Sequence, residues 1–274
     1  MGREPLKIAI VGIAGRLGRS ILHTAAARDD IDIVGAMVSH DSPFKDADIG
    51  LIDKEDPMGV TACVSLEEAC ATADIVIDTS VPKVTAAIAP RLADFGRPIA
   101  LVTGVTGLSK DEHSAVIAAA QHIPVLQARN FSLGLTVVEA ALKQLAASLS
   151  AKTWDAEIIE AHHKRKTDSP SGTALLLGEA IARARGHKHS EVAVFDRPRQ
   201  GEAREEGSIG YSAVRGGGII GEHTVRFLSE LEEVELRHVA RDRAIFAHGA
   251  LDGAKWLATQ PAGHYSMTDM AKTL

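Results

Sequence analysis

The segment from Glu160 to Thr173 holds the densest set of side chains that could do chemistry in this sequence. It contains two adjacent imidazoles, His162 and His163, followed by three cations that end at Lys166. Because imidazole titrates near neutral pH, one histidine can donate or accept a proton while the other binds a substrate. Lys166 can hold a carboxylate or assist the proton transfer. The plain alternative is a solvated basic loop, which a run of three cations alone would favour.

The residues after the cations predict an anion-binding helix start. Residues 157–159 have the apolar character of a short strand, and a helical apolar pattern follows Pro170. Ser169 is the expected N-cap, with Pro170 as the first helical residue. The next backbone N–H groups would then lack partners in the helix and, with the positive helix end, would bind a small carboxylate. These N–H groups belong to Ser171, Gly172 and Thr173.

A second candidate site lies near the N-terminus, where glycines follow the first predicted strand at residues 7–11. The glycine spacing is G-x-x-G-x-x-G, and a helical pattern begins directly after it. Strand, glycine turn and helix in this order are typical of a Rossmann-type loop that holds the pyrophosphate of a dinucleotide. A glycine-rich turn that binds nothing is the alternative. The loop runs through Gly12, Ile13, Ala14, Gly15, Arg16, Leu17 and Gly18.

Further loops are expected to border the same cofactor. The second predicted strand, 31–38, is followed by Ser39-His40-Asp41, without an acid or an arginine directly at the strand end to select between the two nicotinamide dinucleotides. His40 could meet a phosphate and Asp41 a ribose, so the preference between NADH and NADPH stays open. Three later strands end in small polar residues or glycine, and ligands of open α/β sheets bind beyond such strand ends. These ends are 79–80, 103–107 and 129–132.

The order of the predicted elements indicates an α/β fold with two domains. Residues 1–131 alternate strand and helix, as a parallel Rossmann-type sheet does. Residues 132–243 are predicted to form an α+β domain with a mostly antiparallel open sheet. Residues 244–274 are expected to return to the nucleotide-binding domain. A sheet with little helix to cover it is buried most simply against other subunits.

Composition excludes several classes of protein. The chain has 274 residues, of which 45% are hydrophobic and 24% are charged, as in an ordinary soluble globular protein. Its formal net charge is −6, so nucleic-acid binding is not expected and the local basic loop indicates a small anion. The two cysteines predict no disulfide framework, and no metal-ligand spacing is present. Because neither a signal peptide nor a membrane span is recognised, a cytoplasmic enzyme is expected.

Several of these segments resemble the 4-hydroxy-tetrahydrodipicolinate reductase family, formerly called dihydrodipicolinate reductase, of lysine and diaminopimelate biosynthesis. The resemblance rests on E-I-I-E-A-H-H at 157–163, Lys166, and S-P-S-G-T-A at 169–174. The segment G-V-T-G at 104–107 is similar to the family's Gly-Thr-Thr-Gly loop, with Val105 in place of a threonine. The segment 128–132 is similar to the family's Ala-x-Asn-Phe-Ser, and 215–224 to a third family segment, in which His223 is expected to be structural or peripheral.

The resemblance implies NAD(P)H-dependent reduction of 4-hydroxy-tetrahydrodipicolinate to tetrahydrodipicolinate with loss of water, in a homotetramer formed through the second-domain sheet. It implies that His162 is the proton donor or acceptor, and that Lys166 is a proton donor and carboxylate partner. His163, Gly172 and Thr173 would hold the carboxylates of the substrate. The implied cofactor contacts are Gly12, Ile13, Ala14, Gly15, Arg16, Leu17, Gly104, Val105, Thr106, Ala128, Arg129, Asn130 and Phe131.

From the residues alone, only a reductase or dehydrogenase of a carboxylate-bearing substrate can be argued. A different reductase, acting on another imino or keto diacid, would share these loops. A non-catalytic dinucleotide sensor would bind NADH without oxidising it, and the basic loop would be superfluous to it. A metal hydrolase is the most distant alternative, because the sequence lacks His-Glu-x-x-His or a comparable ligand set.

Overall fold

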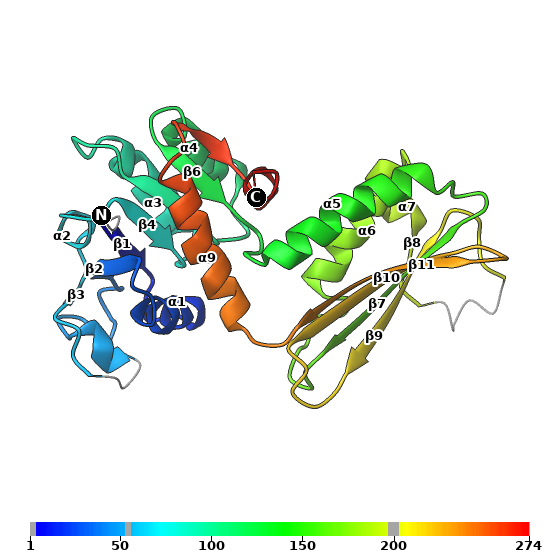
Figure 1. Cartoon of the computed structure of the whole chain (residues 1–274), viewed down its shortest axis with the longest axis horizontal. Helices are drawn as coiled ribbons and strands as arrows, with labels where there is room; N and C mark the ends of the chain where they lie inside the picture. Colours follow the sequence, from blue (N-terminus) through cyan, green and yellow to red (C-terminus); the bar gives the residue numbers. More distant parts are fainter. Residues whose placement is uncertain (1–3, 53–55, 197–202, 274) are drawn as a thin grey trace. The chain divides into compact units, whose positions relative to one another are not determined.

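The computed structural model describes residues 4–52, 56–196 and 203–273. The chain forms two compact units, shown in Figure 1. The first comprises Met1–Leu133 with Ala244–Leu274, and the second comprises Gly134–Arg243. Each unit has its own sheet and its own buried apolar core. No helix in the described part of the chain is long and apolar enough to cross a membrane.

The first unit is built on a seven-stranded sheet with the order β12-β6-β5-β4-β1-β2-β3. All the strand pairings described in it are parallel. The central strands are mostly apolar because helices cover both faces of the sheet, and the buried polar residues Asp78 and Thr103 stand at strand ends. The strands are β1 (Leu6–Val11), β2 (Ile31–Met37), β3 (Ala62–Cys63), β4 (Ile75–Asp78), β5 (Ala100–Thr103), β6 (Pro124–Gln127) and β12 (Gly263–Tyr265).

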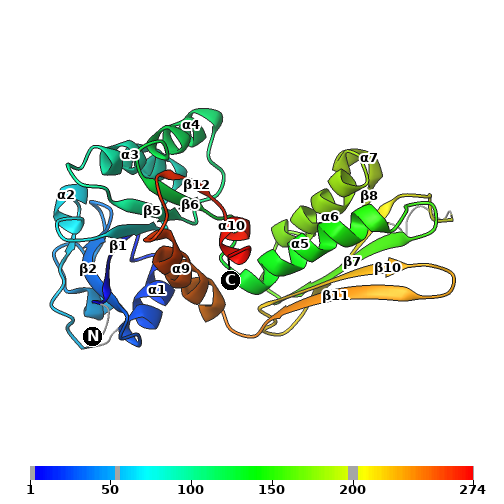
Figure 2. The same ribbon diagram turned by 45° about the horizontal axis from the view of Figure 1, so that its top comes forward.

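Two layers of helices enclose this sheet, as Figure 2 shows. One face is covered by α1 (Arg16–Ala26) and α9 (Ala244–Leu257), whose apolar side chains share a core with β1. The other face is covered by α2 (Leu66–Ala69), α3 (Pro82–Ala93) and α4 (Lys110–Ala119). The short elements η1 (Ile49–Ile52) and α10 (Met267–Ala271) complete the unit.

The second unit contains a five-stranded sheet with the order β11-β10-β7-β9-β8. The predicted fold class, a parallel Rossmann-type sheet plus a second open sheet, is confirmed. The second sheet is mixed, because β10 runs antiparallel to β7 and β11, whereas β7, β9 and β8 are parallel. Its strands are β7 (Asp155–His162), β8 (Ala193–Val194), β9 (Ile209–Arg215), β10 (Gly221–Leu228) and β11 (Glu233–Ala240).

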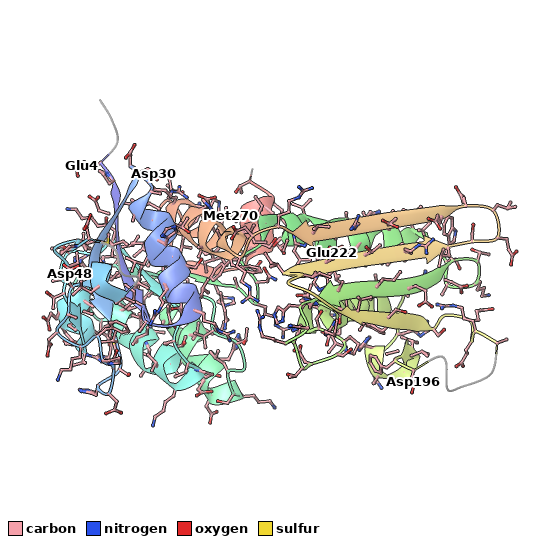
Figure 3. All side chains as sticks on the ribbon, turned by 90° about the horizontal axis from the view of Figure 1, so that it is seen from below. Glu4, Asp30, Asp48, Asp196, Glu222 and Met270 are labelled. Atoms are coloured by element: carbon pink, nitrogen blue, oxygen red, sulfur yellow. The ribbon has the colours of Figure 1, made fainter. Side chains whose placement is uncertain are left out.

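Helices cover one face of the second sheet and leave the other open. The covering helices are α5 (Leu133–Ser148), α6 (Gly172–Ala184) and the short α7 (His189–Val192) (Figure 2). Side chains alternate along β7, so Ile158 packs against the helices while Ile159 faces outward. Figure 3 shows the open face, on which Glu222 lies.

Candidate active site

Four ionisable side chains gather on the helix-covered face of the second sheet, at the end of β7. Glu160 and His162 belong to β7, which ends at His162. Neighbours on a regular strand face opposite sides, so two adjacent histidines can serve one site only where the strand ends. His223 of β10 lies opposite Glu160, and Arg215 of β9 lies opposite His162. The exposed fractions of Glu160, His162 and His223 are 1%, 9% and 6%. These polar groups are therefore buried where the pattern of the strand would otherwise place apolar ones.

The carboxylate of Glu160 accepts hydrogen bonds from three neighbours. Arg215 donates from Nη1 to Oε2 at 2.7 Å and from Nη2 to Oε1 at 2.6 Å. The backbone N–H of Ser171 donates to Oε1 at 3.1 Å, and Nδ1 of His162 lies 2.6 Å from Oε2. Burial by itself would raise the pKa of Glu160, but these partners, Arg215 foremost, hold that pKa below its ordinary value. Glu160 is therefore ionised at neutral pH.

The imidazole of His162 has one fixed nitrogen and one open nitrogen. Since an ionised carboxylate only accepts hydrogen bonds, Nδ1 carries the proton toward Glu160. Nε2 has no hydrogen-bond partner among the described residues and is not one of the buried polar atoms. Gly221 leaves room beside it, because a Cβ at Gly221 would lie 3.2 Å from Nε2. A group that can gain and lose a proton at one accessible atom is what general acid or base chemistry requires.

His223 lies inside this cluster, so of the two expected places, structural or peripheral, the structure favours the structural one. Its ring centroid is 5.1 Å from that of His162, and its Nε2 lies 3.0 Å from the hydroxyl of Ser171. Burial, with a smaller effect of the neighbouring His162, lowers the pKa of His223 to about 4. His223 is therefore a neutral ring at pH 7 that packs against His162.

The helix after the basic loop begins two residues later than predicted. Its N-cap is Ser171, whose hydroxyl accepts from the N–H of Ala174 at 3.2 Å, so the predicted cap at Ser169 and first helical residue at Pro170 are wrong. A tertiary contact decides the cap, because the Ser171 N–H is bound to Glu160 and cannot serve an anion. Gly172 and Thr173 occupy the first two helical positions, whose N–H groups have no acceptor within the helix. Gly172 and Thr173 are therefore the residues whose N–H groups remain open to an anion at this helix start.

The basic loop presents Lys166 in an ion pair near the surface. Its Nζ donates to both carboxylate oxygens of Asp168, at 2.9 and 2.8 Å, and the side chain of Asp168 is 58% exposed. Arg215 also donates to the backbone carbonyl of Asp168 at 2.7 Å, which ties the loop to the buried cluster. Lys166 is 21% exposed, but its partner lies at the surface, where a carboxylate of a ligand can take the place of Asp168.

The second histidine of the pair differs from the first in its surroundings. His163 is half-buried, and its Nδ1 is a buried atom without a hydrogen bond. Burial lowers the pKa of His163, and the neighbouring cations Arg165 and Arg243 lower it further. His163 is therefore neutral at pH 7, so it can take part in binding only as a neutral hydrogen-bonding ring.

In the first unit the glycine loop forms a tight turn between β1 and α1. Gly12 has a φ of +80°, and a Cβ there would lie 3.0 Å from the backbone of Ser80. A Cβ at Gly18 would lie 2.6 Å from the carbonyl oxygen of Gly12, so the helix can approach the turn only without a side chain. Gly15 is the N-cap of α1, and Arg16 and Leu17 are its first residues. The order of the strands changes direction between β1 and β4, which is where ligands of such sheets bind.

The other predicted cofactor loops meet at the ends of β5 and β6. Gly104 packs so closely on Phe131 that a Cβ would lie 2.5 Å from the ring. Asn130 accepts from the N–H of Ser132 at 2.7 Å, which shapes the turn that holds Phe131. A cavity of about 340 Å³ opens here, and the predicted residues that line it are Val105, Thr106, Ala128 and Arg129.

The end of β4 is organised by a residue that the sequence did not single out. Asp78 is fully buried and accepts from the hydroxyls of Ser80 and Thr85, both at 2.5 Å, and from that of Thr103 at 3.1 Å. Burial raises the pKa of Asp78. This carboxyl group links the ends of β4 and β5 to the start of α3.

The sequence prediction also missed the partners of His162. Glu160 and Arg215 enter the sequence prediction only as the first residues of longer segments, and Ser171 was expected to offer its N–H to an anion, whereas that N–H binds Glu160. Glu160 could have been found from its spacing, because residues i and i+2 share one face of a strand. The roles of Arg215 and His223 depend on strand register, which local patterns do not reveal. Among the residues that the structure describes, no group of three or more His, Cys, Asp or Glu could hold a metal ion.

Comparisons with known proteins agree with this architecture. The family model described as dihydrodipicolinate reductase, N-terminus, matches residues 6–131, and the one described as dihydrodipicolinate reductase, C-terminus, matches residues 134–271. The 4-hydroxy-tetrahydrodipicolinate reductase of Caulobacter vibrioides is 43% identical over 269 residues, which are 97% of this chain and 97% of that protein. The reductase of the same name from Rhizobium meliloti is 41% identical over 270 residues, 98% of each chain.

A solved structure shows the same fold. It is the dipicolinate-bound dihydrodipicolinate reductase from Paenisporosarcina sp. TG-14, with a TM-score of 0.79 and 23% identity, and the match covers 97% of this chain and 99% of that one. Both halves of the chain thus match the family models, and its relatives are similar over nearly their whole length. The chain belongs to the dihydrodipicolinate reductase family.

Proposed function

We propose that this protein reduces 4-hydroxy-tetrahydrodipicolinate to tetrahydrodipicolinate with loss of water, in lysine and diaminopimelate biosynthesis. One observation carries the proposal beyond family membership: His162, held by Glu160, lies beside the open start of α6 within a single compact unit. A proton-transfer group next to an anion site suits a dianionic ring that must be both bound and protonated. The first unit would bind the dinucleotide and the second the substrate.

A nicotinamide dinucleotide, NADH or NADPH, supplies the hydride when bound. The residues of the first unit fit this group, because glycines stand at the three positions of the turn, 12, 15 and 18, where a Cβ would lie only 2.6–3.1 Å from backbone atoms, as in a dinucleotide-binding turn. The end of β2 borders this turn, because the N–H of Gly12 donates to the carbonyl of Met37 at 2.9 Å. Ser39 and His40 follow this strand end and are exposed. They offer no carboxylate to repel a 2′-phosphate, and Asp41 is near enough in sequence to meet a ribose. Either dinucleotide is therefore accepted in this proposal.

In the second unit, each residue of the site has a distinct task. Nε2 of His162 gives a proton to the substrate carbon next to the one that receives the hydride, and Lys166 assists as a proton donor. Lys166 also exchanges Asp168 for a substrate carboxylate. His163 and the N–H groups of Gly172 and Thr173 bind the carboxylates, and the hydroxyl of Thr173 adds a further donor.

Steady-state oxidation of NADH and of NADPH, coupled to freshly generated substrate, tests this function. We expect His162→Ala and Lys166→Ala each to lower turnover about 10²–10⁴-fold while NADH binding stays near normal. Lys164→Ala is the matched control, because Lys164 is an exposed cation of the same loop. Wild-type turnover in either purified variant would reject the assigned roles. Activity only on another member of a panel of cyclic imino acids and keto diacids would indicate a different reductase, and NADH binding without oxidation would indicate a sensor.

We further propose a cytoplasmic homotetramer formed through the open face of the second sheet. This face exposes apolar side chains in one region: Ile159, Val214 and Val239 are 36%, 51% and 37% exposed. Burying such a face against other subunits removes apolar surface from water. Light scattering coupled to gel filtration should show a tetramer for the wild type and smaller species for Val214→Asp. A monomeric wild type would reject the assembly.

A further inference from the structure

We infer that Glu160 is a positioning residue for proton transfer: its carboxylate, held by Arg215, fixes the tautomer and the orientation of His162. The inference rests on the proposed role of His162 and extends it to residues that do not touch the substrate. It draws on the geometry at the end of β7, where three elements far apart in the sequence converge on one carboxylate.

The first step of the argument concerns the tautomer of His162. Oε2 of Glu160 lies 2.6 Å from Nδ1, and Glu160 is 1% exposed, so water does not compete for this bond. The bond holds a proton on Nδ1 in both charge states of the ring. All proton exchange must then occur at Nε2, the atom that borders Gly221. Without the carboxylate, the neutral ring could place its proton on either nitrogen.

The second step concerns Arg215, which keeps Glu160 from taking the proton itself. A buried carboxylate without a counter-ion tends to become protonated, and it could then donate to Nδ1 and select the wrong tautomer. Arg215 prevents this by donating to both oxygens, at 2.7 and 2.6 Å, in the two-pronged geometry that a guanidinium offers a carboxylate. Its side chain is 20% exposed, so the pair is largely shielded from solvent.

The third step links proton transfer to substrate binding. Oε1 of Glu160 also accepts from the N–H of Ser171, the residue that caps α6. The same carboxylate therefore sets the position of His162 and of the helix start whose N–H groups face an anion. A shift of Glu160 would move both parts of the site together, and this is why a group that touches neither substrate nor cofactor would affect turnover.

Charges around His162 determine how it responds to the loss of Glu160. Two charged groups come from the sheet, Glu160 of β7 and Arg215 of β9. The imidazoles of His223 and His238 come from β10 and β11, and the uncharged cap Ser171 precedes α6. The loop adds His163 and the cations Lys164, Arg165 and Lys166, with the carboxylate of Asp168 paired to Lys166. Glu160 is the one carboxylate that contacts His162 among the described residues. Glu160→Gln therefore removes the negative charge that this ring faces at 2.6 Å.

Glu160→Gln tests the inference because it removes the charge and keeps the size. We expect kcat to fall about 10–1,000-fold. KM and NADH binding should change less than about threefold, because the amide oxygen of glutamine can still accept from the N–H of Ser171 and keep the helix start in place. The limb of the pH profile of kcat that reports the general acid should move to lower pH. Glu157→Gln is the matched control, because Glu157 lies on the same strand but on the open face, where it pairs with Arg204. Its turnover and pH profile should match the wild type.

Nitrogen-15 NMR of the wild-type imidazoles provides a measurement that does not depend on a variant folding. A neutral His162 with its proton on Nδ1 supports the inference, and a proton on Nε2 overturns it. A folded Glu160→Gln protein with wild-type kcat and an unchanged pH profile also overturns it. If that result occurs while His162→Ala is inactive, only the positioning role fails. If His162→Ala is itself fully active, the proposed role of His162 in the reaction fails first.

Discussion

Arg215 and Glu160 are joined by two hydrogen bonds of 2.7 and 2.6 Å although 55 residues separate them in the chain. The parallel pairing of β7 with β9 brings them together, and the intervening chain carries the basic loop and α6. Replacing a buried ion pair by apolar residues can be neutral, but removing one partner leaves an uncompensated buried charge. Loss of the pair would therefore destabilise the second unit and also displace His162, which is bound to the same carboxylate.

Arg215→Ala should destabilise the protein strongly. The variant leaves the buried carboxylate of Glu160 with only His162 and Ser171 as partners, and we expect the free energy of unfolding to fall by about 3 kcal/mol or more. Urea denaturation followed by circular dichroism measures this change. Arg237→Ala is the matched control, since Arg237 is 55% exposed and pairs with Glu222; it should cost less than about 1 kcal/mol. Equal losses in the two variants would contradict the prediction.

The stability that Glu160 contributes should depend on pH in one direction. Its pKa in the folded protein lies below the ordinary value of 4.5, so its ionised form stabilises the fold above that pH. This contribution is lost as the pH falls below about 4.5 and through the lower pKa of the folded state. We therefore expect the excess stability of the wild type over Glu160→Gln to shrink over that range. A difference that stays constant or grows on acidification would show that the charge is not responsible.

Gly221→Ala should reduce activity without unfolding the protein. Its Cβ would lie 3.2 Å from Nε2 of His162, so it crowds the atom that exchanges protons. Alanine is otherwise acceptable in a strand, and we expect kcat to fall about tenfold or more with little change in the thermal midpoint. The comparison variant is Gly218→Ala, because a Cβ at Gly218 meets no atom within 4 Å. Full activity of Gly221→Ala would mean that Nε2 is not the reacting atom.

Gly18→Ala should weaken dinucleotide binding. The new Cβ would meet the carbonyl oxygen of Gly12 at 2.6 Å and the backbone of Ile13 at 2.7 Å, so α1 must move away from the turn. We expect the Kd for NADH, measured by fluorescence titration, to rise about tenfold or more. Ala26→Gly weakens the same helix by about 1 kcal/mol without approaching the turn, and it should leave NADH affinity unchanged. An unchanged Kd in Gly18→Ala would indicate that the turn does not hold the dinucleotide.

Much of the fold could be predicted because the signals are local. The polar segment predicted to follow a strand at 79–80 does follow β4, which ends at Asp78, and the glycine spacing located the turn between β1 and α1. Close packing of a helix on a turn needs residues without side chains wherever it occurs, so the glycines are readable in the sequence itself. The two histidines likewise required β7 to end at His162, because neighbours on a regular strand face opposite sides.

Local patterns in the chain therefore identify the candidate residues of the site and which of them share a face of a strand. The tertiary structure decided their partners: Arg215 and His223 reach Glu160 and His162 through strand register, and the cap of α6 moved to Ser171 because its N–H binds Glu160. The parallel pairing of β7, β9 and β8 in the second sheet was likewise decided by the tertiary structure. Hydrogen bonds and ion pairs form between groups that are near in space, whatever their separation in the chain. A local pattern predicts which face of a strand a side chain lies on, but not which residue of another strand will lie next to it.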